Sequence, residues 1–228
     1  AFRAAGGRGM NVTLPFKLAA LAVADSASED ARLAGAANTL SFEGGRIEAR
    51  NTDGIGLVRD IEANLGLPLA GRRVLLLGAG GATRGAVRPI ARAGAARIVI
   101  ANRTPDKAET LAVELAPHLG GVPLSGRGLP ALATGEAFDI VINATSASLG
   151  GQAPAVPPAA FAPGALAYDM VYGKGLTPFL RLARQAGCAR LADGVGMLVE
   201  QAAEAFAWWR GARPDTREAL ARLTVPLA

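Results

Sequence analysis

The stretch "RRVLLLGAGGATRG" (residues 72–85) decides the expected fold. Its apolar run predicts a buried parallel strand, and Gly78, Gly80 and Gly81 follow directly, ahead of a segment with helical spacing. Glycines at such a turn let the backbone approach a pyrophosphate, whose charge meets the helix N-terminus. The stretch therefore predicts a dinucleotide site, although Thr83 stands where a strict GxGxxG motif has its third glycine.

Strand-like and helix-like segments continue to alternate after this turn. Pro89 is expected to kink or shorten the first helix, and Thr104 is expected to cap the second. Further strands are predicted in "ARIVIANR", "FDIVINAT", "ALAYDMVY" and "CARLADG", and a helix in "TPFLRLARQAG". This βαβ alternation over residues 72–192 predicts an α/β fold with a doubly wound, parallel Rossmann-type sheet.

The flanking segments predict a second, smaller α/β lobe. A β-hairpin is expected about Gly44 and Gly45, and "GMLVEQAAEAFAWWRG" predicts an apolar helix near the C-terminus. We expect residues 1–52 and 199–228 to form this lobe together, beside a nucleotide-binding domain of residues 53–198.

Composition excludes several classes of protein. Half of the 228 residues are hydrophobic, without the run of about 18 apolar residues that a membrane helix needs, so we expect a cytoplasmic protein without membrane partners. The net charge is +5, but the basic residues are scattered and nearly all arginine, which disfavours nucleic-acid binding. Cys188 and His118 are the only residues of their types, which disfavours disulfides, metal sites and histidine triads.

The end of the second strand indicates which dinucleotide is bound. An NAD enzyme usually has Asp or Glu there for the ribose 2′-hydroxyl, whereas this chain has Asn102 in "ANRTPDK". Arg103, Thr104 and Lys107 are available to donate hydrogen bonds to a 2′-phosphate. We therefore expect NADP(H); the alternative is a solvated helix start with a surface arginine.

Lys17 stands out in "GMNVTLPFK" (residues 9–17). The segment predicts a short strand followed by a helix that starts at Pro15, which places Lys17 in the first helical turn. The helix dipole disfavours an ammonium group there and so favours a role in proton transfer. From the residues alone, a solvated surface lysine is an equal alternative.

The motifs of the whole chain, taken in order, resemble those of the shikimate dehydrogenase family. They are "GMNVTLPFK", "AGAANTL", "NTDG", "LLGAGGATRG", "NRT", "INATS", "YDMVY" with "TPFL", and "DGVGMLVEQAAEAF". The resemblance implies reversible, NADP-dependent reduction of 3-dehydroshikimate to shikimate, a reaction of chorismate and aromatic amino-acid biosynthesis.

The resemblance also implies roles for individual residues. Lys17 and Asp53 would form the catalytic pair. The substrate would contact Thr13, Asn38, Tyr172 and Gln201. The pyrophosphate of the cofactor would bind Gly78, Gly80, Gly81 and Ala82. Its 2′-phosphate would bind Asn102, Arg103, Thr104 and Lys107. Its nicotinamide would lie against Gly194 and Met197.

The sequence departs from the family pattern in two places. The family's opening strand and helix, with a pair of serines that bind the substrate carboxylate, have no counterpart, so we expect an N-terminally incomplete lobe with an open sheet edge. Ser148 stands where the family commonly has glycine.

Rival interpretations remain open at this point. They are a quinate/shikimate dehydrogenase with relaxed cofactor use, a non-catalytic NADP(H)-binding fragment and, with little support, a nucleic-acid binder. The partners we expect are a small-molecule substrate and, as a possibility, a second copy in a homodimer.

Overall fold

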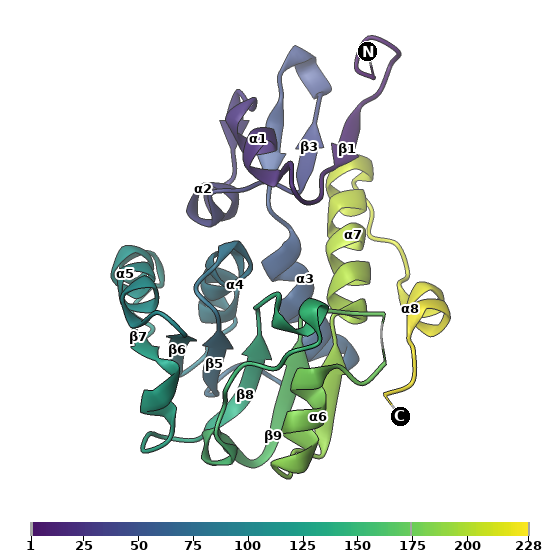
Figure 1. Ribbon diagram of the computed structural model, residues 1–228. Coiled ribbons are helices and arrows are strands. Elements are labelled where there is room, and N and C mark those ends of the chain that lie inside the picture. The colour runs from purple at the N-terminus through teal and green to yellow at the C-terminus, as the bar shows by residue number, and fades with distance from the viewer. Residues whose placement is uncertain (1, 174, 228) are drawn as a thin grey trace.

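A six-stranded parallel sheet forms the larger part of the molecule in the computed structural model, which describes residues 2–173 and 175–227 (Figure 1). Its strand order is β10-β9-β8-β5-β6-β7, and every pair of neighbours is parallel. The strands are β5 (Arg73–Leu77), β6 (Arg97–Asn102), β7 (Leu124–Gly128), β8 (Phe138–Asn143), β9 (Phe161–Asp169) and β10 (Arg190–Asp193). The predicted doubly wound parallel sheet is confirmed, and β7 is a strand that the sequence analysis missed.

Both faces of this sheet are buried, which explains why β5 is apolar from Val74 to Leu77. Val74 and Leu76 point into one core, with α4 (Gly81–Arg92) and α5 (Pro105–Leu115). Leu75 and Leu77 point into the other core, with α6 (Pro178–Gln185). Successive strand residues face opposite sides, so a strand covered on both sides needs a continuous hydrophobic run.

Two expectations about these helices are partly wrong. Pro89 does not shorten α4, which continues to Arg92 because Ile90 and Ala91 bury the last turn in the core. Thr104 occupies the N-cap position of α5, but its side chain makes no capping bond; its carbonyl instead accepts a hydrogen bond from Asn102 Nδ2 at 2.9 Å.

The smaller sheet has four strands in the order β1-β3-β4-β2, so β1 (Gly9–Asn11) is an edge strand. The predicted hairpin is confirmed: β3 (Thr39–Ser41) and β4 (Glu48–Arg50) pair antiparallel across a 3₁₀ turn, Glu43–Gly45. The remaining elements of this part are β2 (Ser26–Ala27), α1 (Lys17–Ala22) and α2 (Glu29–Ala34).

Helix α1 begins at Lys17 rather than at Pro15. A turn precedes the helix, closed by a hydrogen bond from the Phe16 amide to the Thr13 carbonyl at 2.9 Å. The residues that we expected to start the helix therefore belong to this turn, and Lys17 remains in the first helical turn, as predicted.

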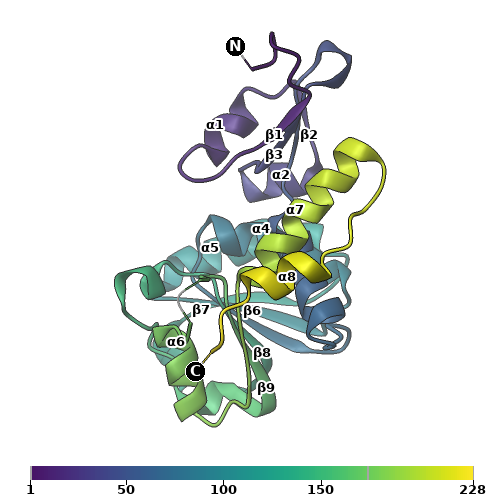
Figure 2. The ribbon, with the colours of Figure 1, turned by 90° about the vertical axis from the view of Figure 1, so that its right-hand side faces the viewer.

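Two helices connect the sheets, as Figures 1 and 2 show: α3 (Asp53–Arg59), continued by a π-helical turn at Asp60–Asn64, and α7 (Val195–Arg210). Helix α7 extends from the larger sheet to β1 and contacts α3 along its length. The rest of the helical structure is α8 (Arg217–Leu223) and short 3₁₀ turns at Ala116–His118, Leu129–Leu132, Ala147–Gly150 and Pro158–Ala160. No helix in this described part of the chain combines the length and apolar character that a membrane crossing needs.

Glycines let α3 pack against its neighbours at backbone distance. A Cβ on Gly54 would lie 2.2 Å from the carbonyl oxygen of Gly85 in α4. A Cβ on Gly56 would lie 2.6 Å from the backbone nitrogen of Gln201 in α7. The helix that begins with Asp53 is therefore held directly against the two helices that begin at the larger sheet's carboxyl edge.

We expect the Gly54→Ala variant to lose about 2 kcal/mol of unfolding free energy, because overpacking against backbone cannot relax by a rotamer change. Denaturant unfolding measures this loss. Gly150→Ala is the matched control, since a Cβ there meets nothing within 4 Å. Equal stability of the two variants would contradict the close α3–α4 contact.

Candidate active site

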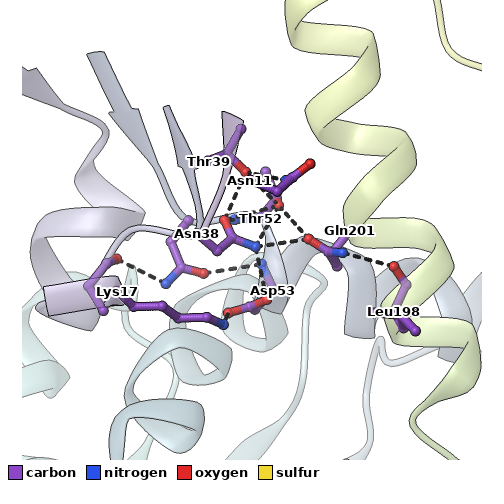
Figure 3. Close-up of polar contacts among 10 residues, drawn as sticks. Asn11, Lys17, Asn38, Thr39, Thr52, Asp53, Leu198 and Gln201 are labelled. Carbon is purple, nitrogen blue, oxygen red and sulfur yellow. Dashed lines mark hydrogen bonds and ion pairs between the residues drawn. The ribbon is translucent and has the colours of Figure 1, made fainter. Parts of the chain in front are cut away.

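Lys17 and Asp53 form an ion pair beside the smaller sheet (Figure 3). Each is the first residue of its helix, α1 or α3, and Lys17 Nζ lies 2.5 Å from Asp53 Oδ2. Both side chains are 23% exposed, so the pair is partly shielded from solvent but open to a ligand. The two residues assigned as a catalytic pair by resemblance are therefore in direct contact.

The side-chain amide of Asn38 links this pair to α7. Its Nδ2 lies 2.9 Å from Asp53 Oδ1, 2.9 Å from Gln201 Oε1 and 3.0 Å from Thr52 Oγ1 (Figure 3). An amide NH₂ has only two hydrogens for these three acceptors. The Thr52 hydroxyl can itself donate, since it lies 3.2 Å from Asn38 Oδ1 and 3.4 Å from Gln201 Oε1, so these side chains can satisfy one another.

Two buried threonines fix the orientation of Asn38. Asn38 Oδ1 accepts hydrogen bonds from the Thr52 backbone N–H at 2.9 Å and from the Thr39 hydroxyl at 3.0 Å. The sequence analysis quoted both residues within "AGAANTL" and "NTDG" but assigned neither a role. Their positions in the sequence, directly after Asn38 and directly before Asp53, could have indicated this role.

The side chains of Thr13 and Tyr172 make no hydrogen bond to this group. Thr13 is an exposed residue of the turn before α1. Tyr172 follows β9 and is 47% exposed. Their contacts with a substrate stay predictions.

The glycine turn after β5 has the geometry of a phosphate cradle. Gly78 adopts a φ of +99°, and a Cβ there would lie 2.9 Å from Thr145 Cγ2, so both conformation and space require glycine. A Cβ on Gly80 or Gly81 would meet nothing within 4 Å, and Ala82 is exposed. This side of the turn is therefore open at the N-terminus of α4, where an anion is stabilised.

Thr83 explains the missing third glycine of the motif. Its side chain is fully buried, and its hydroxyl donates a 2.6 Å hydrogen bond to the Gly78 carbonyl. The bond closes the turn from inside α4. Threonine thus stabilises the conformation that the motif's glycines allow.

The residues assigned to a 2′-phosphate lie at the end of β6, beside the glycine turn. Asn102 is the last residue of β6, and the Gly78 amide donates to the Ala101 carbonyl at 2.8 Å, which places the two strand ends together. Arg103, Thr104 and Lys107 follow and are exposed. Two cations are therefore available next to the cradle.

The residues assigned to the nicotinamide lie at the start of α7. A Cβ on Gly194 would lie 2.4 Å from the Met170 carbonyl oxygen, so the turn before α7 packs against the end of β9. Met197 is half-buried in the first turn of α7.

Ser148 ties the loop after β8 to the end of β9. Its hydroxyl donates to Asp169 Oδ2 at 2.7 Å, and Asn143 Nδ2 donates to Asp169 Oδ1 at 3.0 Å. Burial raises the pKa of Asp169, and these hydrogen bonds with that from Thr177 oppose the rise. The departure from the family's glycine thus adds a hydrogen bond that restrains this loop.

The strand order places the glycine turn and the strand ends around it at one edge of the larger sheet. Strands β6 and β8 flank β5 on opposite sides, and their crossovers run in opposite directions from it. Ligands of open α/β sheets bind at the carboxyl ends of strands at such a switch point. An open glycine turn there, with a lysine–aspartate pair formed by the first residues of α1 and the adjoining α3, defines a dinucleotide-dependent oxidoreductase. Among residues 2–173 and 175–227, no cluster of three or more His, Cys, Asp or Glu side chains is placed to hold a metal ion.

Comparison with known proteins identifies the family. The chain matches family models described as "Shikimate / quinate 5-dehydrogenase" (residues 61–150), "Shikimate dehydrogenase substrate binding domain" (1–40) and "Shikimate 5'-dehydrogenase C-terminal domain" (194–223). It is 57% identical to the shikimate dehydrogenase (NADP(+)) of Dechloromonas aromatica, over 99% of this chain and 81% of that protein.

Solved structures agree with this assignment. An Ael1 enzyme from Pseudomonas putida superposes with a TM-score of 0.94 at 61% identity, over 100% of this chain and 82% of the other. The Thermus thermophilus shikimate 5-dehydrogenase in complex with NADP(H) and shikimate has a TM-score of 0.80 at 36% identity, over 95% of this chain and 79% of the other. The chain belongs to the shikimate dehydrogenase family.

Proposed function

We infer that the chain is an NADP-dependent shikimate dehydrogenase, which reversibly reduces the ketone of 3-dehydroshikimate to the hydroxyl of shikimate. The observation that carries this function is the contact between Lys17 and Asp53, 2.5 Å apart. It is supported by the cofactor named for the Dechloromonas relative and by the cations that follow β6.

The chain's own residues supply proton transfer and alignment in this reaction. NADPH provides the hydride when bound. Lys17 gives a proton to the ketone oxygen during reduction and takes one from the hydroxyl during oxidation. Asp53 holds the amine in place, and Asn38 and Gln201, which are hydrogen-bonded to each other beside it, bind ring hydroxyls of the substrate.

The test is the initial rate of NADPH formation from NADP⁺ and shikimate, with quinate as the comparison substrate. We expect a rate with shikimate that exceeds the rate with quinate at equal concentration. Equal rates would favour the quinate/shikimate alternative. A folded sample that binds NADPH without turnover would favour the non-catalytic alternative.

Arg103→Ala should weaken NADP⁺ binding by roughly 10- to 100-fold and leave NAD⁺ binding nearly unchanged, because a charge-assisted bond contributes about 1.5–3 kcal/mol and only NADP⁺ has the 2′-phosphate. The KM values of the two cofactors measure the difference. An equal loss for both cofactors would contradict the 2′-phosphate role.

Several finer features stay predictions. They are the domain boundaries 1–52 with 199–228 and 53–198, a homodimer, and a cytoplasmic location. Sedimentation at micromolar concentration tests the homodimer, which would have about twice the mass of this chain.

A further inference from the structure

A buried phenol–carboxylate pair lies beneath the start of α7. The Tyr168 side chain in β9 is 0% exposed, and its hydroxyl donates to Asp60 Oδ2 at 2.7 Å. The same hydroxyl oxygen accepts a hydrogen bond from the Met197 backbone N–H at 3.3 Å. Three elements therefore meet at one hydroxyl: a strand of the larger sheet, the extension of α3 and the first turn of α7.

The surroundings hold both groups in place. Asn64 Nδ2 donates to Asp60 Oδ1 at 2.8 Å. A Cβ on Gly196 would overlap Asp60, at 1.9 Å from Oδ1, so the carboxylate packs against the backbone of α7. Burial raises the pKa of Tyr168 well above its ordinary value, so the phenol stays protonated and able to donate.

This pair joins the two helices that carry Asp53 and Gln201, because Asp60 follows α3 and the Tyr168 hydroxyl bonds the first turn of α7. Asp53 begins α3 and Asp60 follows the end of that helix. Met197 is one helical turn before Gln201 on α7. Between Asp53 and Asp60, Gly56 of α3 packs against the backbone of Gln201 in α7. A shift of α7 along β9 would thus move the nicotinamide contact and the substrate contact together.

We propose that Asp60 and Tyr168 are positioning residues for hydride transfer: they fix the start of α7 against β9 and so set where Met197 and Gln201 lie relative to Asp53. The proposal rests on the function inferred above. Hydride transfer needs its reacting atoms about 3–3.5 Å apart, and a misplacement of about 1 Å can cost roughly 10²-fold in rate. Neither side chain needs to touch a ligand for this effect.

The test is the Tyr168→Phe variant, which removes one oxygen and keeps the ring. At a temperature below that at which the variant unfolds, we expect kcat for shikimate to fall roughly tenfold or more, with a small change in KM. The primary deuterium isotope effect on kcat, with shikimate deuterated at the carbon that is oxidised, should rise because hydride transfer becomes slower than the other steps. Asp60→Asn keeps one acceptor oxygen for two donors, the Tyr168 phenol and Asn64 Nδ2, so it should lower kcat as well.

Trp209→Phe is the matched control, because it also removes one hydrogen-bond donor and keeps an aromatic ring, at the far end of α7, where Trp209 Nε1 donates to the Leu40 carbonyl at 3.0 Å. It should lower the unfolding temperature and leave kcat and the isotope effect unchanged. If Tyr168→Phe behaves like this control, the pair is only structural and the proposal is wrong.

A second measurement separates this proposal from the proposed function. Amide exchange of residues 195–198 should quicken in Tyr168→Phe while the second half of α7 stays protected, and NADPH fluorescence on binding should change. Neither readout needs turnover. If the parent chain lacks activity, the proposed function fails; if these amides and the fluorescence match the parent, the positioning role fails.

Discussion

Removing the Lys17 amine is expected to slow shikimate oxidation by roughly 10³-fold, within the range of about 10²–10⁴ for a positioned proton-transfer group. The Lys17→Met variant keeps a stem of similar length, so the change is confined to the ammonium group. Such a loss corresponds to about 4 kcal/mol of transition-state stabilisation. The rate is followed by NADPH absorbance, and NADPH affinity should stay unchanged because Lys17 lies on α1 and the phosphate cradle lies on α4.

Arg46→Met is the control for the loss of one positive charge. Arg46 is exposed and ends the turn between β3 and β4. Its replacement should leave the rate within about twofold of the parent. If the two variants have similar activity, Lys17 is not the proton-transfer group.

The larger sheet was predictable because its signals are local. The run at residues 73–77, the glycines after it and the recurring strand–helix pattern each depend on neighbours in sequence, and all are confirmed. β7 escaped because "LSGRG" has one large apolar residue and two glycines. Gly126 is needed there, since a Cβ would lie 2.2 Å from the backbone of Ala108 in α5. Local strand propensity contains no information about a helix that packs so closely on the strand that only glycine fits.

The site was predictable only in part because its contacts are long-range. Lys17 and Asp53 are 36 residues apart, and their pairing followed from the family resemblance rather than from any spacing. The bond between Asp60 and Tyr168 spans 108 residues, and neither residue belongs to a pattern that suggests it. The sequence shows Thr83 in place of the third glycine of the motif, but only the structure shows that its hydroxyl closes the turn.

The Asp53→Asn variant is expected to lose roughly 10²-fold in kcat. Asparagine keeps the size of the side chain but replaces one acceptor oxygen with an NH₂ group. In the parent, Oδ2 accepts from Lys17 and Oδ1 accepts from Asn38. One of these two donors must therefore face the new NH₂ group, so either the amine or the amide loses its position. Asp215→Asn, at an exposed carboxylate near α8, is the matched control and should keep the parent rate.

The double variant Lys17→Met/Asp53→Asn decides whether the two residues act as one unit. If Asp53 works only by holding the Lys17 amine, its loss costs nothing further once the amine is gone, and the double variant should match Lys17→Met alone. If the two losses multiply, to roughly 10⁵-fold, Asp53 has a separate role, such as direct contact with the substrate. The 2.5 Å contact between Nζ and Oδ2 and the shared 23% exposure favour the first result, because the carboxylate bonds the amine directly in a partly shielded place.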